Sequence, residues 1–193
     1  MKKRFLSMLM AIVLALGMLP HSAFASGSVD EALGEVDIYN GGSKFSYLSM
    51  NGRVQSFLYT YYNFVNSKGE VKEIPAYCVN PNLYGVPQTV AEGESIKYLA
   101  QEKSSDPKVM GIIANGYPTR SLQELGLDNK YQAYYATKMA LWCYIISGWD
   151  ISKLKVNPSL TGDELIRGNK MLAAAKDIYA RGVMWDKIYE PNP

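Results

Sequence analysis

The distribution of apolar residues divides the chain into two parts with different periods. Between residues 36 and 79 apolar and polar positions alternate, and Asn and Gly residues separate the runs. Such alternation is typical of β-strands. From about Ser95 onward the apolar residues recur every three or four positions, which is the spacing of helices. The pattern therefore predicts strands in the first part and helices in the second.

A hairpin is expected where Asn51-Gly52 separates two alternating runs, residues 45–50 and 53–63. The Asn-Gly pair favours a tight primed turn, because its backbone twist matches that of paired antiparallel strands. We therefore expect these two runs to pair with each other.

Two further strands are expected in the same part of the chain. The first covers residues 36–39 and is followed by a predicted turn at 40–42, where the sequence reads Asn-Gly-Gly. The other runs from about residue 70 to residue 79, so Cys78 would lie at the end of a strand.

Three short helical segments are predicted after the strands. Residues 95–100 show helical spacing, and residues 121–125 fit a single further turn. Between them, residues 108–115 form an apolar run that is followed by Gly116 and then Pro118. Glycine after the last turn and proline beyond it are typical of a helix end, so Gly116 is expected to be the C-cap.

The segment from residue 129 to residue 147 predicts a long buried helix. Its side chains are apolar or aromatic on nearly every face, and Lys138 is its sole charge after Lys130. A helix that is apolar all round packs inside a domain rather than on its surface. Gly148 is expected to end it.

A last helix is expected from Thr161 to about Arg181. Thr161 and Glu164 have the spacing of a capping box, which satisfies backbone N–H groups at a helix start. Residues 183–193 have the composition of a linker. The buried stripe of this helix is predicted at Leu165, Leu172 and Tyr179.

The first 25 residues have the pattern of a secretory signal peptide. Three basic residues precede an apolar run at 5–19, and small residues at 23 and 25 suit a cleavage site. The alternative is a membrane anchor, but the run is shorter than the roughly 20 residues that span a bilayer. We therefore expect residues 1–25 to be removed, leaving a flexible lead-in at 26–35 and no membrane insertion.

Removal of residues 1–25 changes the composition in two ways that exclude functions. The formal charge falls from +2 to −1, so no basic surface for nucleic acid or anionic lipid is expected. His21 is the only histidine, and it would be lost. A chain without histidine has no Ser-His-Asp or Cys-His pair and no Cys/His zinc site, so we expect no metal and no cofactor.

The two cysteines, Cys78 and Cys143, leave two alternatives open. Two cysteines in an exported chain are by default a candidate disulfide. Alternatively, Cys143 is a core residue of the long helix. On that helix it lies about 140° round from Lys138, which makes it hard for Cys78 to face both residues.

Three short motifs together resemble a known family. They are Tyr77-Cys78-Val79, Gly116-Tyr117-Pro118, and residues 136–142, which read Ala-Thr-Lys-Met-Ala-Leu-Trp. In this order they resemble the thioester domains of Gram-positive surface adhesins, and the resemblance covers roughly Gly34 to Gly182. It implies an α+β fold, with a β-rich barrel or sandwich lobe and a helical lobe, in a module spanning residues 36–182.

The resemblance also implies a reactive bond, but one residue departs from the pattern. In the family, a cysteine in a Tyr-Cys-aliphatic motif forms a thioester with a glutamine in a Thr-Gln-x-Ala-aliphatic-Trp motif. Cys78 matches the cysteine, and Lys138 stands where the glutamine is expected. The residues Tyr77, Thr137, Ala140 and Trp142 match the supporting positions.

A lysine cannot form this bond, because an amine offers no acyl carbon to a thiolate. Gln132 is the nearest glutamine, but six residues along a helix place it about 9 Å away and some 240° round. A thioester between Cys78 and a glutamine outside the motif stays as an alternative only if an irregular turn places that glutamine.

The expected pair of Cys78 and Lys138 has three possible fates. Burial among aromatic side chains favours the neutral amine of Lys138, whereas a nearby thiolate favours its ammonium. An ammonium–thiolate pair and an oxidative bridge between sulfur and nitrogen are two products. In the third case Lys138 extends to solvent and Cys78 is an inert thiol.

The function expected from these observations is that of a secreted, non-enzymatic module at the cell surface or in the cell wall. It would be the adhesin part of a longer wall-anchored or pilus-associated protein and bind a host or extracellular-matrix protein. One alternative is a pilus or stalk domain that has lost the reactive bond. Another is an acyl-transfer enzyme with Cys78 as its nucleophile, which lacks a histidine base.

Overall fold

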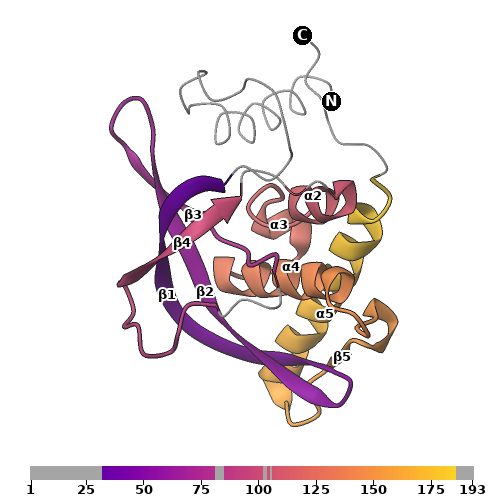
Figure 1. The fold of residues 1–193 in the computed structure, drawn as a ribbon. Helices are drawn as coiled ribbons and strands as arrows, with labels where there is room; N and C mark the ends of the chain where they lie inside the picture. Colours follow the sequence, from indigo (N-terminus) through magenta and orange to yellow (C-terminus); the bar gives the residue numbers. More distant parts are fainter. Residues whose placement is uncertain (1–31, 81–84, 102–103, 105, 186–193) are drawn as a thin grey trace.

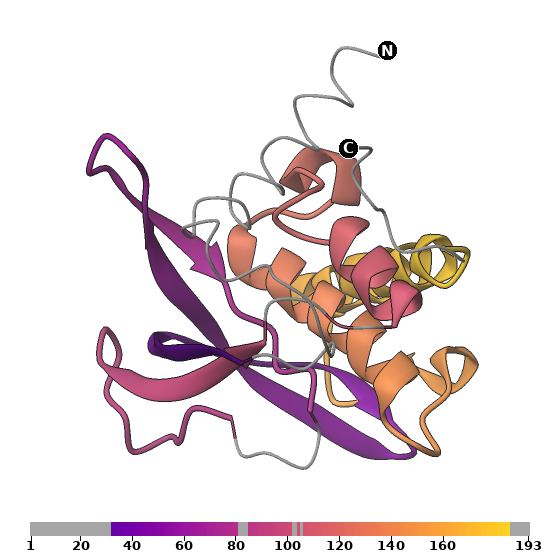
Figure 2. The same ribbon diagram turned by 45° about the horizontal axis from the view of Figure 1, so that its top comes forward.

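The computed structural model describes residues 32–80, 85–101, 104 and 106–185. It is an α+β fold, as expected, in which a curved antiparallel sheet packs against a group of helices (Figures 1 and 2). The expected signal peptide, residues 1–25, lies outside the described residues, as do most of the lead-in and residues 186–193. Residues 32–35 of the expected lead-in already belong to the first strand.

The sheet has five strands in the order β3-β2-β1-β4, with β5 pairing β1. The strands are β1 (Ala32–Met50), β2 (Arg53–Val65), β3 (Val71–Pro75), β4 (Ser95–Gln101) and β5 (Lys155–Val156). The predicted hairpin is confirmed, because β1 and β2 are antiparallel and Met50 pairs with Arg53. Asn51 and Gly52 both have positive φ angles, of 50° and 77°, as a primed two-residue turn requires.

The predicted turn at residues 40–42 is wrong, because β1 continues through it as one strand with a bulge. The Asn40 side chain accepts a hydrogen bond from the Gly42 N–H at 2.8 Å and donates one to the Val90 carbonyl at 2.7 Å. Gly42 has φ 72°, which a glycine adopts without strain. The Asn-Gly-Gly sequence thus bends a strand instead of ending it.

Two other predicted boundaries differ from the structure. Residues 95–101 form β4 and not a helix, and Ile96 pairs with Ile38 of β1. The sheet offers this segment a ladder of hydrogen bonds that outweighs its helical spacing. The third strand ends at Pro75, three residues before Cys78. Cys78 therefore lies in the segment that leaves the sheet.

The helices are α2 (Pro107–Ala114), α3 (Leu122–Leu125), α4 (Lys130–Ile145), the 3₁₀ turn η2 (Ile151–Lys153) and α5 (Gly162–Gly182). The short helix, the extra turn and the long helix are all confirmed. The prediction that α4 is buried is confirmed as well, since ten consecutive residues from Gln132 to Leu141 are buried. It ends at Ile145, before Gly148.

Two cap predictions are wrong. The C-cap of α2 is Asn115, whose backbone angles are φ −93° and ψ 0°, and Gly116 follows it in the loop. Thr161 is the N-cap residue of α5, but its side chain makes no capping hydrogen bond.

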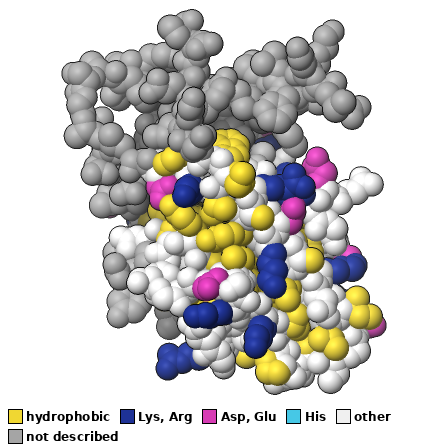
Figure 3. Space-filling view, turned by 90° about the vertical axis from the view of Figure 1, so that its right-hand side faces the viewer, with side chains coloured by type: hydrophobic (Ala, Val, Ile, Leu, Met, Phe, Trp, Pro, Cys, Tyr) yellow, Lys and Arg dark blue, Asp and Glu magenta, His cyan; other side chains and the backbone are white. Residues whose placement is uncertain are grey.

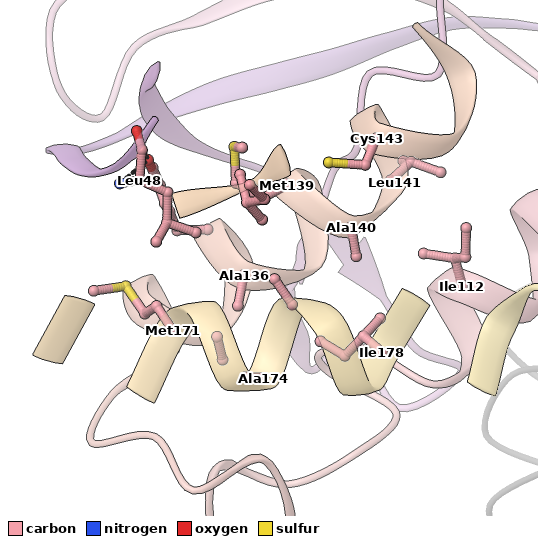
Figure 4. Packing of buried hydrophobic residues seen from close by; sticks show 14 of the residues in the cluster. Leu48, Ile112, Ala136, Met139, Ala140, Leu141, Cys143, Met171, Ala174 and Ile178 are labelled. Atoms are coloured by element: carbon pink, nitrogen blue, oxygen red, sulfur yellow. Dashed lines mark hydrogen bonds between the residues drawn. The ribbon is translucent and has the colours of Figure 1, made fainter. Parts of the chain in front are cut away.

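The buried face of α5 also differs from the prediction. Leu165 is 40% exposed, and Leu172 and Tyr179 are only partly buried. The face that packs on α4 and α2 includes Met171, Ala174 and Ile178, which Figure 4 shows, and Ala175 and Gly182. Gly168 is buried against β5 and β1. Small residues let neighbouring helices approach closely, so side-chain size and not hydrophobicity alone selects this face. On the outer side of α5, apolar side chains remain visible between basic ones (Figure 3).

In the part of the chain that the structure describes, no helix is long and apolar enough to cross a membrane.

Candidate functional site

The segment after β3 is held in place on helix α4 by hydroxyl groups. The Ala76 carbonyl accepts hydrogen bonds from Thr60 Oγ1 at 2.8 Å and from the Tyr134 hydroxyl at 3.1 Å. The two hydroxyls are themselves 2.7 Å apart. Because Thr60 lies on β2 and Tyr134 on α4, the start of the segment is fixed between the sheet and the helix.

Tyr77 connects this segment to the loop after α2. Its ring stacks on that of Tyr134, with centroids 5.0 Å apart and planes at 15°. Its hydroxyl donates to the Tyr117 carbonyl at 2.6 Å. Burial raises the pKa of Tyr77 well above its usual value, so the hydroxyl stays protonated and remains a donor.

The loop at Gly116 and Tyr117 rests on Thr137 of α4. The Tyr117 N–H donates to Thr137 Oγ1 at 3.0 Å, and the Thr137 hydroxyl donates to the Ala133 carbonyl at 2.8 Å. A Cβ atom on Gly116 would collide with the Thr137 side chain. Gly116 is therefore required because it lets the loop after α2 approach Thr137 of α4 closely, and not because it caps a helix. The three sequence motifs thus meet at Tyr77, Tyr117 and Thr137.

Cys78 is half-buried and lies beside Trp142. The Trp142 indole N–H donates to the Cys78 carbonyl at 3.1 Å. The thiol donates to the Asn80 carbonyl at 3.2 Å. Tyr98 of β4 is also nearby: burial raises its pKa, and the electrostatic interaction with Cys78 adds to the rise. Cys78 therefore sits between α4 and β4.

Lys138 is buried in a cage of aromatic rings, which we define as Phe57, Tyr134 and Trp142. Only 8% of Lys138 is exposed, so the alternative in which it extends to solvent is wrong. Its Nζ lies 4.6 Å from the ring centroid of Phe57 and 5.5 Å from those of Tyr134 and Trp142. It also donates to the Tyr134 hydroxyl at 3.4 Å. The ammonium is stabilised by the rings' negative faces and one hydroxyl.

Trp142 is the shared neighbour of the two predicted site residues. Its N–H holds the Cys78 backbone, and its ring forms one wall around Lys138. The thiol and the amine each take another hydrogen-bond partner, Asn80 and Tyr134 respectively. The fourth motif residue, Ala140, is fully buried and packs in the core between α4 and α5 (Figure 4).

Gln132 and Cys143, the residues of the alternative bonds, lie in other surroundings. The Gln132 carboxamide accepts from the Asp128 N–H at 3.1 Å and donates to the Asp128 carboxylate at 3.5 Å. Cys143 is a free thiol in the core, where burial raises its pKa to about 12 (Figure 4). Cys78 is also free.

Three residues of the site were not identified from the sequence. Phe57 and Thr60 lie on β2, and the alternation of that strand could have placed Phe57 on the face toward α4. Tyr98 was missed because its segment was predicted as a helix. Among the described residues, no group of three or more His, Cys, Asp or Glu side chains could hold a metal ion.

A family model described as thioester domain matches residues 75–183, which is more than half of the chain. The chain belongs to the thioester domain family. The match begins at the last residue of β3, so it contains Cys78, the Tyr117 loop and all of α4 and α5. The sheet strands β1 and β2 precede the matched part. The thioester domain family occurs in surface adhesins.

Two solved structures are similar to this thioester domain. One is the thioester domain of the Enterococcus faecium TIE86 protein, with 20% identity and a TM-score of 0.46 over 80% of this chain and 54% of that chain. The other is the Bacillus anthracis TIE protein, with 17% identity and a TM-score of 0.49 over 81% of this chain and 25% of that one. The chain thus spans about half of the first solved chain and a quarter of the second. No curated protein matches it.

An ion pair joins β3 to α4 in this thioester domain. Glu73 Oε1 lies 2.6 Å from Lys130 Nζ and accepts from the Tyr59 hydroxyl at 2.7 Å. Burial acts to raise the pKa of Glu73, but the hydrogen bonds from Lys130 and Tyr59 outweigh it and lower the pKa below its usual value. The ionised Glu73 therefore stabilises the fold at pH values above about 4.3, the pKa of glutamate in the unfolded chain.

This stabilisation is lost as the pH falls from the unfolded pKa through the lowered folded pKa. We expect Glu73→Gln to remove it, so that stability declines less steeply below about pH 4.5. Because the side chains of Glu73 and Lys130 are each about one-third exposed, the free energy of unfolding at neutral pH should fall by less than about 1 kcal/mol in Glu73→Gln. Urea unfolding at several pH values measures it. Glu70→Gln is the control. If the stability of Glu73→Gln fell as steeply below about pH 4.5 as that of the control and the unaltered chain, Glu73 would not be the source of this acid dependence.

Proposed function

We propose that the protein is a non-enzymatic ligand-binding module of a bacterial surface adhesin and binds a host or extracellular-matrix protein without a Cys–Gln thioester. The observation that carries the proposal is the burial of the Lys138 amine beside Trp142. The resemblance of the sequence motif assigns Lys138 to the position of the family's glutamine. An amine has no acyl carbon, so Cys78 cannot form the family bond with it. The ligand would therefore be held by non-covalent contacts.

The aromatic cage supports this proposal, because it gives Lys138 a structural role. Phe57 belongs to the sheet, whereas Tyr134 and Trp142 belong to α4. The buried ammonium therefore connects the two parts of the fold at the position where the family bond would connect them. A desolvated cation over aromatic rings contributes about 2 kcal/mol or more. Non-covalent contacts of this size hold the two parts together.

The surroundings of Cys78 support a non-enzymatic role. Its thiol donates to a carbonyl, and its described neighbours Trp142 and Tyr98 are not bases at neutral pH. A nucleophilic cysteine needs a base or a cation that stabilises the thiolate. In the proposed function Cys78 retains its place in the fold without being a nucleophile.

The proposal includes a place for the module. We propose that it is secreted and displayed at the surface or in the wall of a Gram-positive cell, as part of a longer wall-anchored or pilus-associated protein. Two features support this: the signal-peptide pattern at residues 1–25, and the fact that the chain spans only part of both similar proteins.

Intact-mass spectrometry of the purified chain tests the state of the bond. We expect the full mass of a chain with two thiols, and no adduct after incubation with methylamine. Alkylation of the native protein should modify Cys78 and leave Cys143 unmodified, because Cys143 is 3% exposed and its pKa is raised to about 12. After unfolding, both should react.

A mass lower by one ammonia, with a methylamine adduct that Cys78→Ala abolishes, would mean a thioester with another glutamine. A mass lower by two hydrogens would mean an oxidised bridge or a disulfide. Binding itself is tested on a panel of immobilised matrix proteins. If none retains the module at micromolar concentration, the stalk alternative replaces the adhesin proposal.

A further inference from the structure

A hollow of about 450 Å³ lies at the hairpin end of the sheet. It is lined by Met50, Asn51, Arg53, Gln55 and Trp149. These residues come from two elements: the turn and first residues of the β1–β2 hairpin, and the loop after α4. Asn51 Nδ2 donates to the Gly148 carbonyl at 3.3 Å and so ties the two walls together.

The strand register places the hollow and the aromatic cage around Lys138 on the same face of β2. Arg53 and Gln55 pair with Met50 and Leu48, which are buried, so both side chains lie on the face of β2 that covers the core. Phe57 comes next on this face and is a wall of the aromatic cage. The face therefore runs directly from the hollow to Lys138.

The groups in the hollow offer a defined chemistry. Among residues 32–80, 85–101 and 106–185, no carboxylate pairs with Arg53. The amide nitrogens of Asn51 and Gln55 donate to the carbonyls of Gly148 and Arg53, and their amide oxygens have no partner in the same residues. The hollow thus combines one unpaired cation, two neutral acceptors and the partly exposed indole of Trp149.

We propose that this hollow binds an acidic peptide segment, in which an Asp or Glu side chain lies next to an apolar one. The carboxylate pairs with the Arg53 guanidinium, which suits two parallel hydrogen bonds. Peptide N–H groups donate to the oxygens of Asn51 and Gln55, and the apolar side chain packs on Trp149. The proposal rests on the proposed ligand-binding function and specifies the chemistry of the ligand.

The two acceptor oxygens favour a peptide over a phosphate polymer. A peptide backbone supplies N–H donors for them, whereas phosphate oxygens are acceptors and would face acceptors. A single cation is also a poor match for a chain with one charge per nucleotide.

The hollow is connected to Cys78 through two indoles. The Trp149 and Trp142 rings meet edge to face, with centroids 6.0 Å apart and planes at 64°. Trp142 donates to the Cys78 carbonyl. A peptide seated against Trp149 would therefore be separated from Cys78 by the two indole rings, and binding should alter the indole N–H signals of both tryptophans.

The experiment is an NMR titration of the full purified chain that follows the tryptophan indole N–H signals. The probes are two blocked tetrapeptides, acetyl-Gly-Phe-Glu-Gly-amide and the same peptide with Gln in place of Glu. We expect the Glu peptide to shift the Trp149 signal and to bind at least about tenfold more tightly than the Gln peptide, because the charge-assisted bonds to Arg53 are lost.

Two variants make the test specific. Arg53→Gln should bind the Glu peptide about tenfold more weakly, and its preference over the Gln peptide should vanish. Lys68→Gln removes the same charge in the turn beyond the other end of β2, a strand about 40 Å long, and should bind like the unaltered chain. Equal binding of both peptides, unchanged binding in Arg53→Gln, or no shift with the unaltered chain would each overturn the proposal. So would an Arg53-dependent preference for a single-stranded oligonucleotide.

The intact mass of the same sample separates this proposal from the proposed function. A full mass without peptide binding means that the hollow is not the ligand site, while the module still lacks a thioester. Retention by a matrix protein in the absence of peptide binding places the ligand elsewhere on the surface.

Discussion

Replacing Lys138 with glutamine is expected to create a thioester with Cys78, the bond that we propose is missing from the unaltered chain. The substitution supplies an acyl carbon in a side chain that starts from the same place on α4, beside Trp142. Cys78 is held at that ring by the indole hydrogen bond to its carbonyl. If residue 138 is the glutamine position of the family, Lys138→Gln should lose one ammonia in most molecules. Methylamine should then add to it, and the Cys78 thiol should no longer be alkylated.

Two controls make this result interpretable. Cys78→Ala combined with Lys138→Gln should keep its full mass and take up no methylamine. Lys138→Met keeps an unbranched side chain of similar length without an acyl carbon, and it should also keep its full mass. A folded Lys138→Gln variant that retains the full mass and both free thiols would show that residue 138 does not occupy the glutamine position.

Replacing Gly111 with alanine is expected to destabilise the fold by about 3 kcal/mol, the upper part of the range for overpacked cores. Gly111 lies on the buried side of α2, where that helix crosses the end of α5. A Cβ atom there would collide with the Gly182 carbonyl and would lie 2.6 Å from Trp185 Cγ. The carbonyl is backbone and cannot rotate away, so the two helices have to separate.

The gain in helix propensity from glycine to alanine is about 1 kcal/mol and does not offset this collision. Thermal unfolding should show a midpoint roughly 6–12 °C lower. Gly85→Ala is the matched control, since no atom lies within 4 Å of a Cβ built at Gly85 and its φ is not positive. A midpoint within 2 °C or so of the unaltered chain in Gly111→Ala would mean that α2 and α5 are not packed this closely.

The parts of the fold that the sequence predicted correctly depend on local chemistry. The turn at Asn51-Gly52 follows from the backbone preferences of these two residues. The burial of α4 follows from its composition, because a helix that is apolar on nearly every face is stable only inside a domain. The predictions were wrong where contacts with residues far away in the sequence determine the structure of a segment. Residues 95–101 are a strand because β1 offers them hydrogen bonds, and the face of α5 is chosen by Gly111 and other small residues on its neighbours.

The candidate site was predictable to the same extent. The motif residues Tyr77, Thr137 and Trp142 do converge on Cys78 and its segment, because each contributes a hydrogen bond that depends on residue type. Burial of Lys138 was one of the alternatives that the sequence left open, since long side chains also often reach solvent from a helix. It follows from Phe57, whose position over the amine depends on the register of a strand some 80 residues away.

The pairing of β1 with β5 has a consequence for the order in which the chain folds. Leu48 and Ser49 pair with Val156 and Lys155, more than 100 residues later. The β1–β2 hairpin needs only neighbouring residues and can form early, whereas this contact waits until the helical part has been made. During synthesis from the N-terminus, the edge of β1 at Leu48 and Ser49 stays unpaired until β5 has been made. The charged and bulged stretches of this strand would then limit aggregation of the incomplete chain.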